Sequence, residues 1–230
     1  MILFKNTLDR AAEAEYKERV LNTFKQPPLI SDLNENLVPR PDVERLLSKA
    51  MTHESDRYFL ISGGHGVGKT TAVKSSLHNL GKDGGCVYIA VDVANPAEIW
   101  DQLDAAFTPT PKRASHLRNT ALETVSNRPI ETKVVNRKLV NTQVWHFVNS
   151  LTNDFIERSL MGEIVAGAKE YKKEFKKRPV LVIDDVNFLA KDCPEILTKL
   201  QRWAKRCADD QALGIIFVSS DGLAPQQLSK

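Results

Sequence analysis

The sequence predicts an α/β fold in which a parallel sheet carries helices on both of its faces. Short apolar runs of strand-forming residues alternate along the chain with segments of helical spacing. One run, at 58–62, leads into GGHGVGKT at 63–70, which a helical segment follows. Another run, at 179–185, reads PVLVIDD and holds four consecutive apolar residues. Runs of this kind are typical of parallel strands that are buried on both faces.

The composition excludes some classes of protein. The chain of 230 residues is long enough for one α/β domain with its own core, or for one domain with appendages. Its net charge of +3 is mild and favours no class of partner. The three cysteines have neither metal-ligand nor disulfide spacing, which is typical of a reducing compartment. No apolar run approaches the roughly 18 residues that span a bilayer, and the N-terminal MILF is too short for a signal peptide. We therefore expect an intracellular protein, of the cytoplasm or the nucleus, with no membrane association.

The segment GGHGVGKT fits the phosphate-binding pattern G-x-x-x-x-G-K-[ST], and it lies between a strand and a helix as that pattern requires. Its four glycines would adopt backbone conformations closed to other residues, so that the loop amides surround phosphate oxygens at the helix N-terminus. Lys69 would reach the β- and γ-phosphates, and the Thr70 hydroxyl would ligate Mg²⁺. The alternative is a glycine-rich turn that merely precedes a helix. The nucleotide-binding residues predicted here are Gly63, Gly64, His65, Gly66, Val67, Gly68, Lys69, Thr70 and Thr71.

Two carboxylates, Asp184 and Asp185, stand at the end of the apolar run 179–185. In open α/β sheets ligands bind beyond the carboxyl ends of the strands, where the phosphate-binding loop also lies. Asp184 would therefore hold Mg²⁺ through its water shell, and Asp185 would polarise the attacking water. The last apolar run, GIIFVS at 214–219, predicts a further strand. Ser219 or Ser220 at its tip would contact the γ-phosphate or that water, with an ordinary strand-to-loop turn as the alternative. The predicted catalytic residues are Asp185, Lys69 and Ser219, and the predicted metal ligands are Thr70 and Asp184.

The remaining segments predict an N-terminal helix and an irregular insertion. Residues 6–25 have the spacing of an amphipathic helix, which either packs on the core or belongs to a preceding domain. We take 1–35 as this helix with its linker and 36–230 as the core. Residues 108–141 are rich in Lys and Arg, which favours either a solvated insertion or a surface for nucleic acid or an acidic partner. Other expected elements are a strand at 86–93 and a helix that begins at Pro41. Three further helices are expected at 97–107, 142–177 and 194–207.

With both motifs in place, the layout resembles the AAA+ and STAND ATPases of the P-loop NTPase class. It looks most like the origin-recognition-type and archaeal-type STAND ATPase domains, and it is also similar to the ATPase domains of Crinkler-like proteins of fungi and oomycetes. The segment LVPRPDVERLL is similar to the family's hVGRxxEhxxL stretch, which lines the adenine pocket. That likeness implies that Val38, Pro39 and Arg40 border the base, with Pro39 in place of the usual glycine. The resemblance covers roughly residues 36–220.

The resemblance implies a three-layer sandwich with the strand order 1-4-3-2 and the P-loop strand at the edge. The family's fifth strand, helical lid and sensor arginine are not found in the sequence, so we expect a chain that is truncated after the fourth strand. The implied function is ATP binding and Mg²⁺-dependent ATP hydrolysis that drives a conformational switch or motor. One alternative is a nucleotide-dependent oligomerisation or signalling module that holds ATP or ADP without turnover, with a homo-oligomer or another protein as its partner. Another is a DNA-binding ATPase that uses the insertion and residues 172–178.

Overall fold

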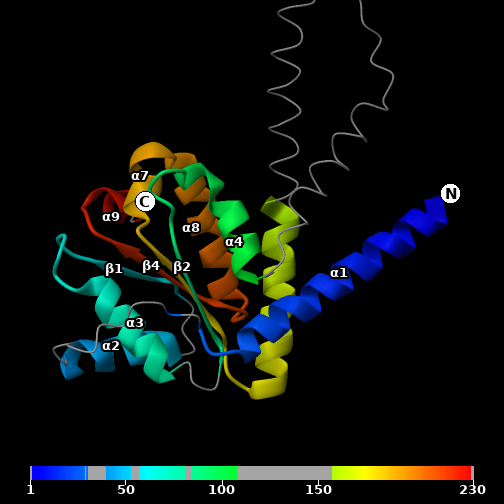
Figure 1. The fold of residues 1–230 in the computed structure, drawn as a ribbon, viewed down its shortest axis with the longest axis horizontal. Helices are drawn as coiled ribbons and strands as arrows, with labels where there is room; N and C mark the ends of the chain where they lie inside the picture. The colour runs from blue at the N-terminus through cyan, green and yellow to red at the C-terminus, as the bar shows by residue number, and fades with distance from the viewer. Residues whose placement is uncertain are drawn as a thin grey trace, which may run out of the picture.

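The protein is described by a computed structural model that covers residues 2–28, 30, 40–52, 57–80, 84–107 and 157–228. The basic segment 108–141, and Val38 and Pro39 of the expected adenine pocket, lie outside the described residues. The first half contains α1 (Ile2–Lys25), α2 (Pro41–Thr52), β1 (Phe59–Ser62), α3 (Lys69–Leu80), β2 (Cys86–Ala90), the 3₁₀ turn η2 (Pro96–Glu98) and α4 (Ile99–Phe107). The second half contains a helix over 157–175, then β3 (Val180–Asp184), α7 (Asn187–Asp192), α8 (Pro194–Asp209), β4 (Gly214–Ser219) and α9 (Leu223–Leu228) (Figure 1).

The four described strands form one parallel sheet in the order β1-β4-β3-β2. This confirms the predicted parallel sheet and the strand order that the resemblance implied. In the register, Ser62 lies beside Ser219, and Ala90 lies beside Asp184. Because all the strands run in one direction, their carboxyl ends meet at one edge of the sheet. The loop after β1 and the carboxylates at the end of β3 therefore lie at the same edge.

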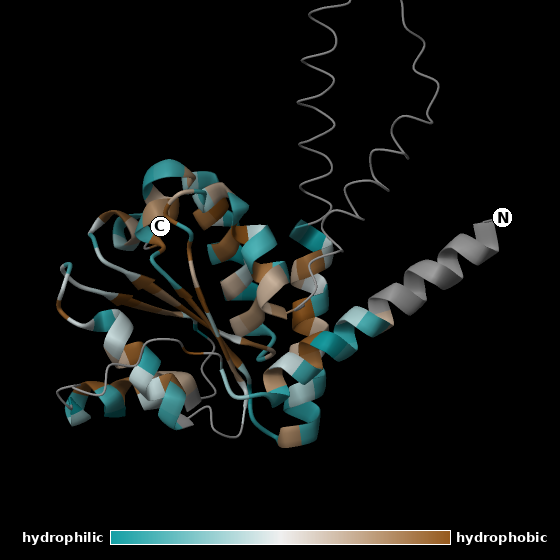
Figure 2. Ribbon diagram, in the orientation of Figure 1, coloured by the Kyte–Doolittle hydropathy of each residue, from teal (hydrophilic) through white to brown (hydrophobic). Residues whose placement is uncertain are grey.

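Helices cover both faces of the sheet, as the sequence predicts. On one face, α2 and α3 bury Leu47, Val73 and Leu77 against Val182 and other residues of the strands. On the other face, a larger core unites α1, α4, α7, α8, α9 and the helix over 157–175. All five residues of β3 are buried. Figure 2 shows the hydrophobic strands between these two helical layers.

Strand β2 is shorter than the predicted strand at 86–93 because the chain turns directly after it. The Val91 N–H still donates to the Asp184 carbonyl oxygen at 3.0 Å. The Asp92 carboxylate then accepts the N–H of Ala94 at 2.9 Å, which forms a local turn that competes with strand pairing. The helix predicted from 97 accordingly begins as the 3₁₀ turn η2 and becomes α-helical only at Ile99.

The second half of α1 packs into the larger core. Tyr16, Val20 and Phe24 are buried there. The Phe24 ring lies 5.3 Å from that of Phe107 and 5.8 Å from that of Tyr171, measured between centroids. Of the two interpretations of this helix, the structure therefore supports packing on the core. No helix in the described part of the chain has the length and apolar character needed to cross a bilayer.

The crossing of α1 with the helix over 157–175 depends on a glycine. A Cβ at Gly167 would lie 2.7 Å from Val20 Cβ, closer than side-chain carbons pack. We expect Gly167→Ala to lower the free energy of unfolding by about 1–3 kcal/mol through overpacking. The control is Gly162→Ala in the same helix, where a Cβ would meet nothing within 4 Å. The free energy of unfolding of this control should rise by up to about 1 kcal/mol, because alanine has a higher helix propensity than glycine. Urea unfolding followed by circular dichroism measures both, and equal stabilities would show that α1 does not pack at Gly167.

Candidate functional site

The loop between β1 and α3 has the backbone of a phosphate-binding loop. Gly66 and Gly68 have φ angles of +77° and +86°, in the left-handed region that favours glycine. A Cβ at either position would meet nothing within 4 Å, so the need for glycine there is conformational and not steric. Gly63 and Gly64 do not share this conformation. The expectation that all four glycines take conformations closed to other residues is therefore wrong for Gly63 and Gly64. These two residues directly follow β1, and the chain turns only after them, at Gly66 and Gly68.

The Lys69 side chain folds back over the loop. Its Nζ donates to the carbonyl oxygens of Gly63 and Gly64, at 2.8 Å each. A Cβ on Gly63 would lie 3.6 Å from Lys69 Cδ, so a side chain larger than a methyl group would compete with the lysine stem for this space. This gives Gly63 a packing role. The ammonium group is thus held on the loop itself, at the first residue of α3.

Asp184 is a buried carboxylate with a fixed orientation. Asp184 is the last residue of β3, and it is 1% exposed. Its Oδ1 accepts the N–H of Asp185 at 2.7 Å, and its Oδ2 accepts the phenol O–H of Tyr88 at 2.9 Å. Both oxygens are hydrogen-bonded, as a buried charge requires.

Asp185 faces the phosphate-binding loop. Burial raises the pKa of its carboxyl group, and the neighbouring Asp184 carboxylate raises this pKa further. The basic side chains of Lys69, His65 and Lys74 lower the same pKa. These three residues belong to the loop and to α3, so the structure brings the two sequence motifs together. Asp185 also has a φ of +59°, a left-handed conformation that is uncommon for residues other than glycine.

Ser219 and Ser220 lie at the tip of β4, beside the site. Ser219 is fully buried, and its Oγ donates to the carbonyl oxygen of Asp221 at 3.3 Å. The Asp221 carboxylate in turn accepts the N–H of Leu223, where α9 begins. The Ser220 N–H donates to the Asn187 side-chain oxygen at 3.2 Å, which ties β4 to the start of α7. The Ser219 hydroxyl is thus engaged in a turn, and its contact with a phosphate stays a prediction.

Arg40 is the described residue of the expected adenine pocket. It directly precedes α2, and its guanidinium donates to the Val67 carbonyl oxygen at 3.3 Å. Arg40 therefore contacts the phosphate-binding loop. His65 and Val67 are exposed on that loop, and Thr70 follows Lys69 in the first turn of α3.

Tyr88 and Lys74 are part of the site although the sequence motifs do not include them. Tyr88 donates to Asp184, and Lys74 Nζ lies 5.3 Å from the centroid of the Tyr88 ring. The strand at 86–93 was predicted, but its register against 179–185 cannot be derived from the sequence. The only available signal was a tyrosine in an apolar strand, because buried phenols need a hydrogen-bond partner.

The donors at the site suit Mg²⁺ bound together with a nucleotide. Mg²⁺ retains several waters and takes one or two carboxylates together with substrate phosphates. The Asp184 carboxylate and the Thr70 hydroxyl would supply oxygen ligands of this kind. Within the described residues no group of three or more His, Cys, Asp or Glu side chains could hold a metal ion by itself. These residues therefore fit a metal that arrives with phosphate.

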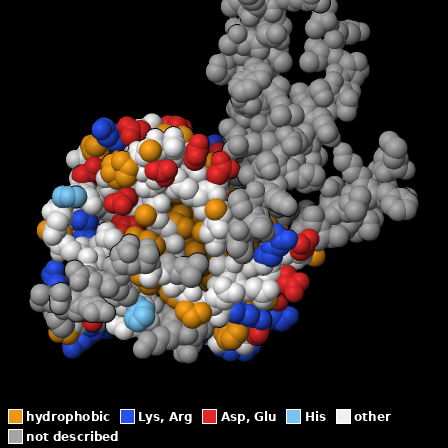
Figure 3. Space-filling model, viewed as in Figure 1, with side chains coloured by type: hydrophobic (Ala, Val, Ile, Leu, Met, Phe, Trp, Pro, Cys, Tyr) orange, Lys and Arg blue, Asp and Glu red, His pale blue; other side chains and the backbone are white. Residues whose placement is uncertain are grey.

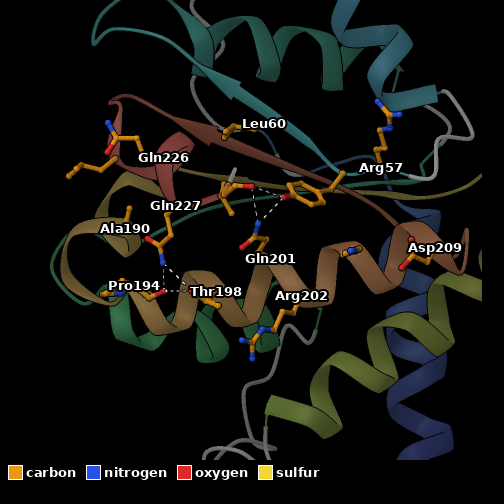
Figure 4. A pocket seen from close by; sticks show the side chains of 14 residues that line it. Arg57, Leu60, Ala190, Pro194, Thr198, Gln201, Arg202, Asp209, Gln226 and Gln227 are labelled. Atoms are coloured by element: carbon orange, nitrogen blue, oxygen red, sulfur yellow. Dashed lines mark hydrogen bonds between the residues drawn. The ribbon is translucent and has the colours of Figure 1, made fainter. Parts of the chain in front are cut away.

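A cavity of about 1140 Å³ lies elsewhere, on the face of the sheet opposite α3. It is lined by residues of β1, α8 and α9 (Figure 4). Gln201 of α8 donates to the Tyr58 phenol oxygen at 3.0 Å and to the Leu228 carbonyl oxygen at 2.8 Å. None of the predicted site residues lines this cavity.

Comparison with known proteins agrees with this geometry. Residues 51–226 match the protein family described as the AAA domain. No curated protein matches the chain. The matched region covers more than half of the chain and includes both the phosphate-binding loop and the carboxylates that follow β3. The chain belongs to the AAA domain family and is a nucleotide-binding P-loop ATPase.

Proposed function

We propose that this protein binds Mg-ATP and hydrolyses it to ADP and phosphate, with Asp185 as the general base, and that turnover drives a conformational switch or motor of the AAA+/STAND type. The observation that carries the proposal is the position of Asp185 within the electrostatic influence of Lys69 and His65, beside the fixed carboxylate of Asp184. One edge of the sheet thus presents a phosphate-binding cation, a metal-binding carboxylate and a base.

Phosphate binding would exchange partners at Lys69. Its ammonium now donates to two loop carbonyl groups, which are neutral acceptors. Phosphate oxygens are charged acceptors and form stronger hydrogen bonds with an ammonium group. The turns at Gly66 and Gly68 and the N-terminus of α3 direct backbone N–H groups to the same place. Asp184 and Thr70 would hold Mg²⁺ when it arrives with the nucleotide, and the ion would supply positive charge against the charge that develops on the phosphates.

Water activation would fall to Asp185. The raised pKa makes its carboxylate a stronger proton acceptor than an ordinary aspartate. The attacking water forms a bond to the γ-phosphorus, the bond to the β,γ-bridging oxygen breaks, and the water's proton passes to the Asp185 carboxylate. Two hydrogen bonds, one to each of its oxygens, hold Asp184 in place beside this reaction.

A second candidate is a module that uses ATP or ADP as a structural ligand and oligomerises or releases a partner without turnover. The engagement of the Ser219 hydroxyl with Asp221 supports it, since that hydroxyl would have to exchange this hydrogen-bond partner in order to donate to a γ-phosphate. Proteins of the AAA family often assemble into oligomers.

The described residues favour a nucleic-acid partner less. Lys172 donates to the Gln211 carbonyl oxygen at 3.0 Å, and Arg178 is only 9% exposed. These two cations of the basic run at 172–178 are therefore occupied within the fold. In the view of Figure 3, acidic and basic side chains are intermixed on the described surface, without a continuous basic face.

We expect Lys69→Ala to weaken binding of the fluorescent analogue mant-ATP by tenfold or more, because a hydrogen bond to a charged group contributes about 1.5–3 kcal/mol. Lys205→Ala, on α8 beside the opposite cavity, is the matched control and should bind as the wild type does. An equal loss of mant-ATP affinity in both variants would show that Lys69 has no specific role in phosphate binding.

We expect Asp185→Asn to bind mant-ATP within about twofold of the wild type and to lose about a hundredfold or more in ATP turnover. Phosphate release with Mg²⁺ present measures this. Undiminished turnover would rule out Asp185 as the base. Binding without turnover by the wild type would favour the structural-ligand module instead.

Asp185→Asn should also stabilise the metal-free protein at neutral pH. Since the pKa of Asp185 is raised in the folded state, its protonated form favours folding, and this contribution is lost as the pH rises through the folded-state pKa. The melting temperature of the variant should therefore exceed that of the wild type most at neutral pH. This difference should shrink as the pH falls toward the unfolded-state pKa of about 3.9. Thermal unfolding in EDTA between about pH 4 and 8 tests this, with Asp209→Asn on the surface of α8 as the control. A difference that grows as the pH falls would contradict it.

A further inference from the structure

Tyr88 makes a side-chain hydrogen bond to one oxygen of the Asp184 carboxylate. Its phenol O–H donates to Asp184 Oδ2 at 2.9 Å, while the Asp185 N–H donates to Oδ1 at 2.7 Å. A carboxylate has about four lone-pair sites, so each oxygen can still accept a second donor. The two bonds therefore fix the plane of the Asp184 carboxylate and leave lone pairs on its oxygens for further donors.

We propose that Tyr88 is a positioning residue that orients the Asp184 carboxylate toward the water shell of nucleotide-bound Mg²⁺, an inference that rests on the proposed function. Partners of this kind matter because a ligating carboxylate must be held in orientation. Their loss typically costs ten- to hundredfold in metal affinity.

The register of the sheet explains why this position holds a tyrosine. Tyr88 pairs with Val182, and Ala90 pairs with Asp184. Residues two apart in a strand share a face and rise about 3.3 Å each, so Tyr88 lies about 7 Å behind Asp184 along the strands. A phenol extends far enough along the sheet surface to bridge this gap. The hydroxyl of a serine or threonine at this position would fall short of the carboxylate.

Helix α3 contacts the Tyr88 ring through Lys74. Lys74 Nζ lies 5.3 Å from the centroid of the Tyr88 ring, at a distance typical of a cation–π contact. Lys74 follows Lys69 by five residues in the same helix, so the ring lies between the phosphate-binding helix and Asp184.

The test compares Tyr88→Phe with Tyr58→Phe. Tyr58 is the matched control because it also lies next to the sheet and its hydroxyl is hydrogen-bonded, to the Leu228 carbonyl oxygen at 2.9 Å, but it lines the cavity opposite α3. Binding of mant-AMPPNP, a fluorescent ATP analogue that is not hydrolysed, is measured first in EDTA and then against increasing MgCl₂. Thermal unfolding of each variant reports any general loss of stability.

We expect Tyr88→Phe to bind the analogue in EDTA within about twofold of the wild type. The Mg²⁺ concentration that gives half of the maximal Mg²⁺-dependent gain in analogue binding should rise about tenfold or more in this variant. Tyr58→Phe should keep the wild-type Mg²⁺ midpoint even if its melting temperature falls. An unchanged midpoint in Tyr88→Phe, or an equal shift in both variants, overturns this inference alone. A wild type that does not bind the analogue at any Mg²⁺ concentration overturns the proposed function, and this inference falls with it.

Discussion

The site depends on how the fold satisfies one buried carboxylate, that of Asp184. A charge at 1% exposure costs several kcal/mol unless it is well hydrogen-bonded. One of its donors is the N–H of the next residue, and Asp185 presents that N–H from a left-handed conformation at φ +59°. Such a conformation costs on the order of 1 kcal/mol or more. The hydrogen bond that stabilises Asp184 therefore also constrains the backbone of Asp185, whose carboxylate lies within the electrostatic influence of Lys69 and His65.

The sequence predicts the parts of this site that are continuous in the chain. GGHGVGKT carries its own context, since a strand precedes it and a helix follows it, and the structure places both there. The run VLVIDD is apolar enough to require a strand buried on both faces, and β3 is buried throughout. Parallel strands then bring both segments to one edge without further information.

The rest depends on contacts between segments, which spacing alone does not specify. The apolar face of α1 was visible in Tyr16, Val20 and Phe24, but not its partners Phe107 and Tyr171. Tyr88 is a further case, because a shift of one residue between β2 and β3 would direct its side chain to the opposite face of the sheet. The different roles of the loop glycines likewise cannot be derived from their spacing in the sequence. Only the φ angles distinguish Gly66 and Gly68, which turn the chain, from Gly63, which makes room for Lys69.

The charges at this edge explain why nucleotide and metal should bind together. Asp184 and Asp185 are adjacent carboxylates, and the Asp184 carboxylate raises the free energy of the ionised form of Asp185. The opposing charge comes from the loop and α3, and chiefly from Lys69. When phosphate binds, Lys69 pairs with phosphate oxygens, and further negative charge arrives beside the two aspartates. Without a divalent cation the carboxylates would repel the phosphates, and Asp185 would hold its proton more strongly and fail as a base. A divalent cation held by Asp184 would offset this repulsion and favour the ionised form of Asp185. Under the proposed function, the arrangement of this chain's own charges would therefore make phosphate binding and metal binding mutually favourable.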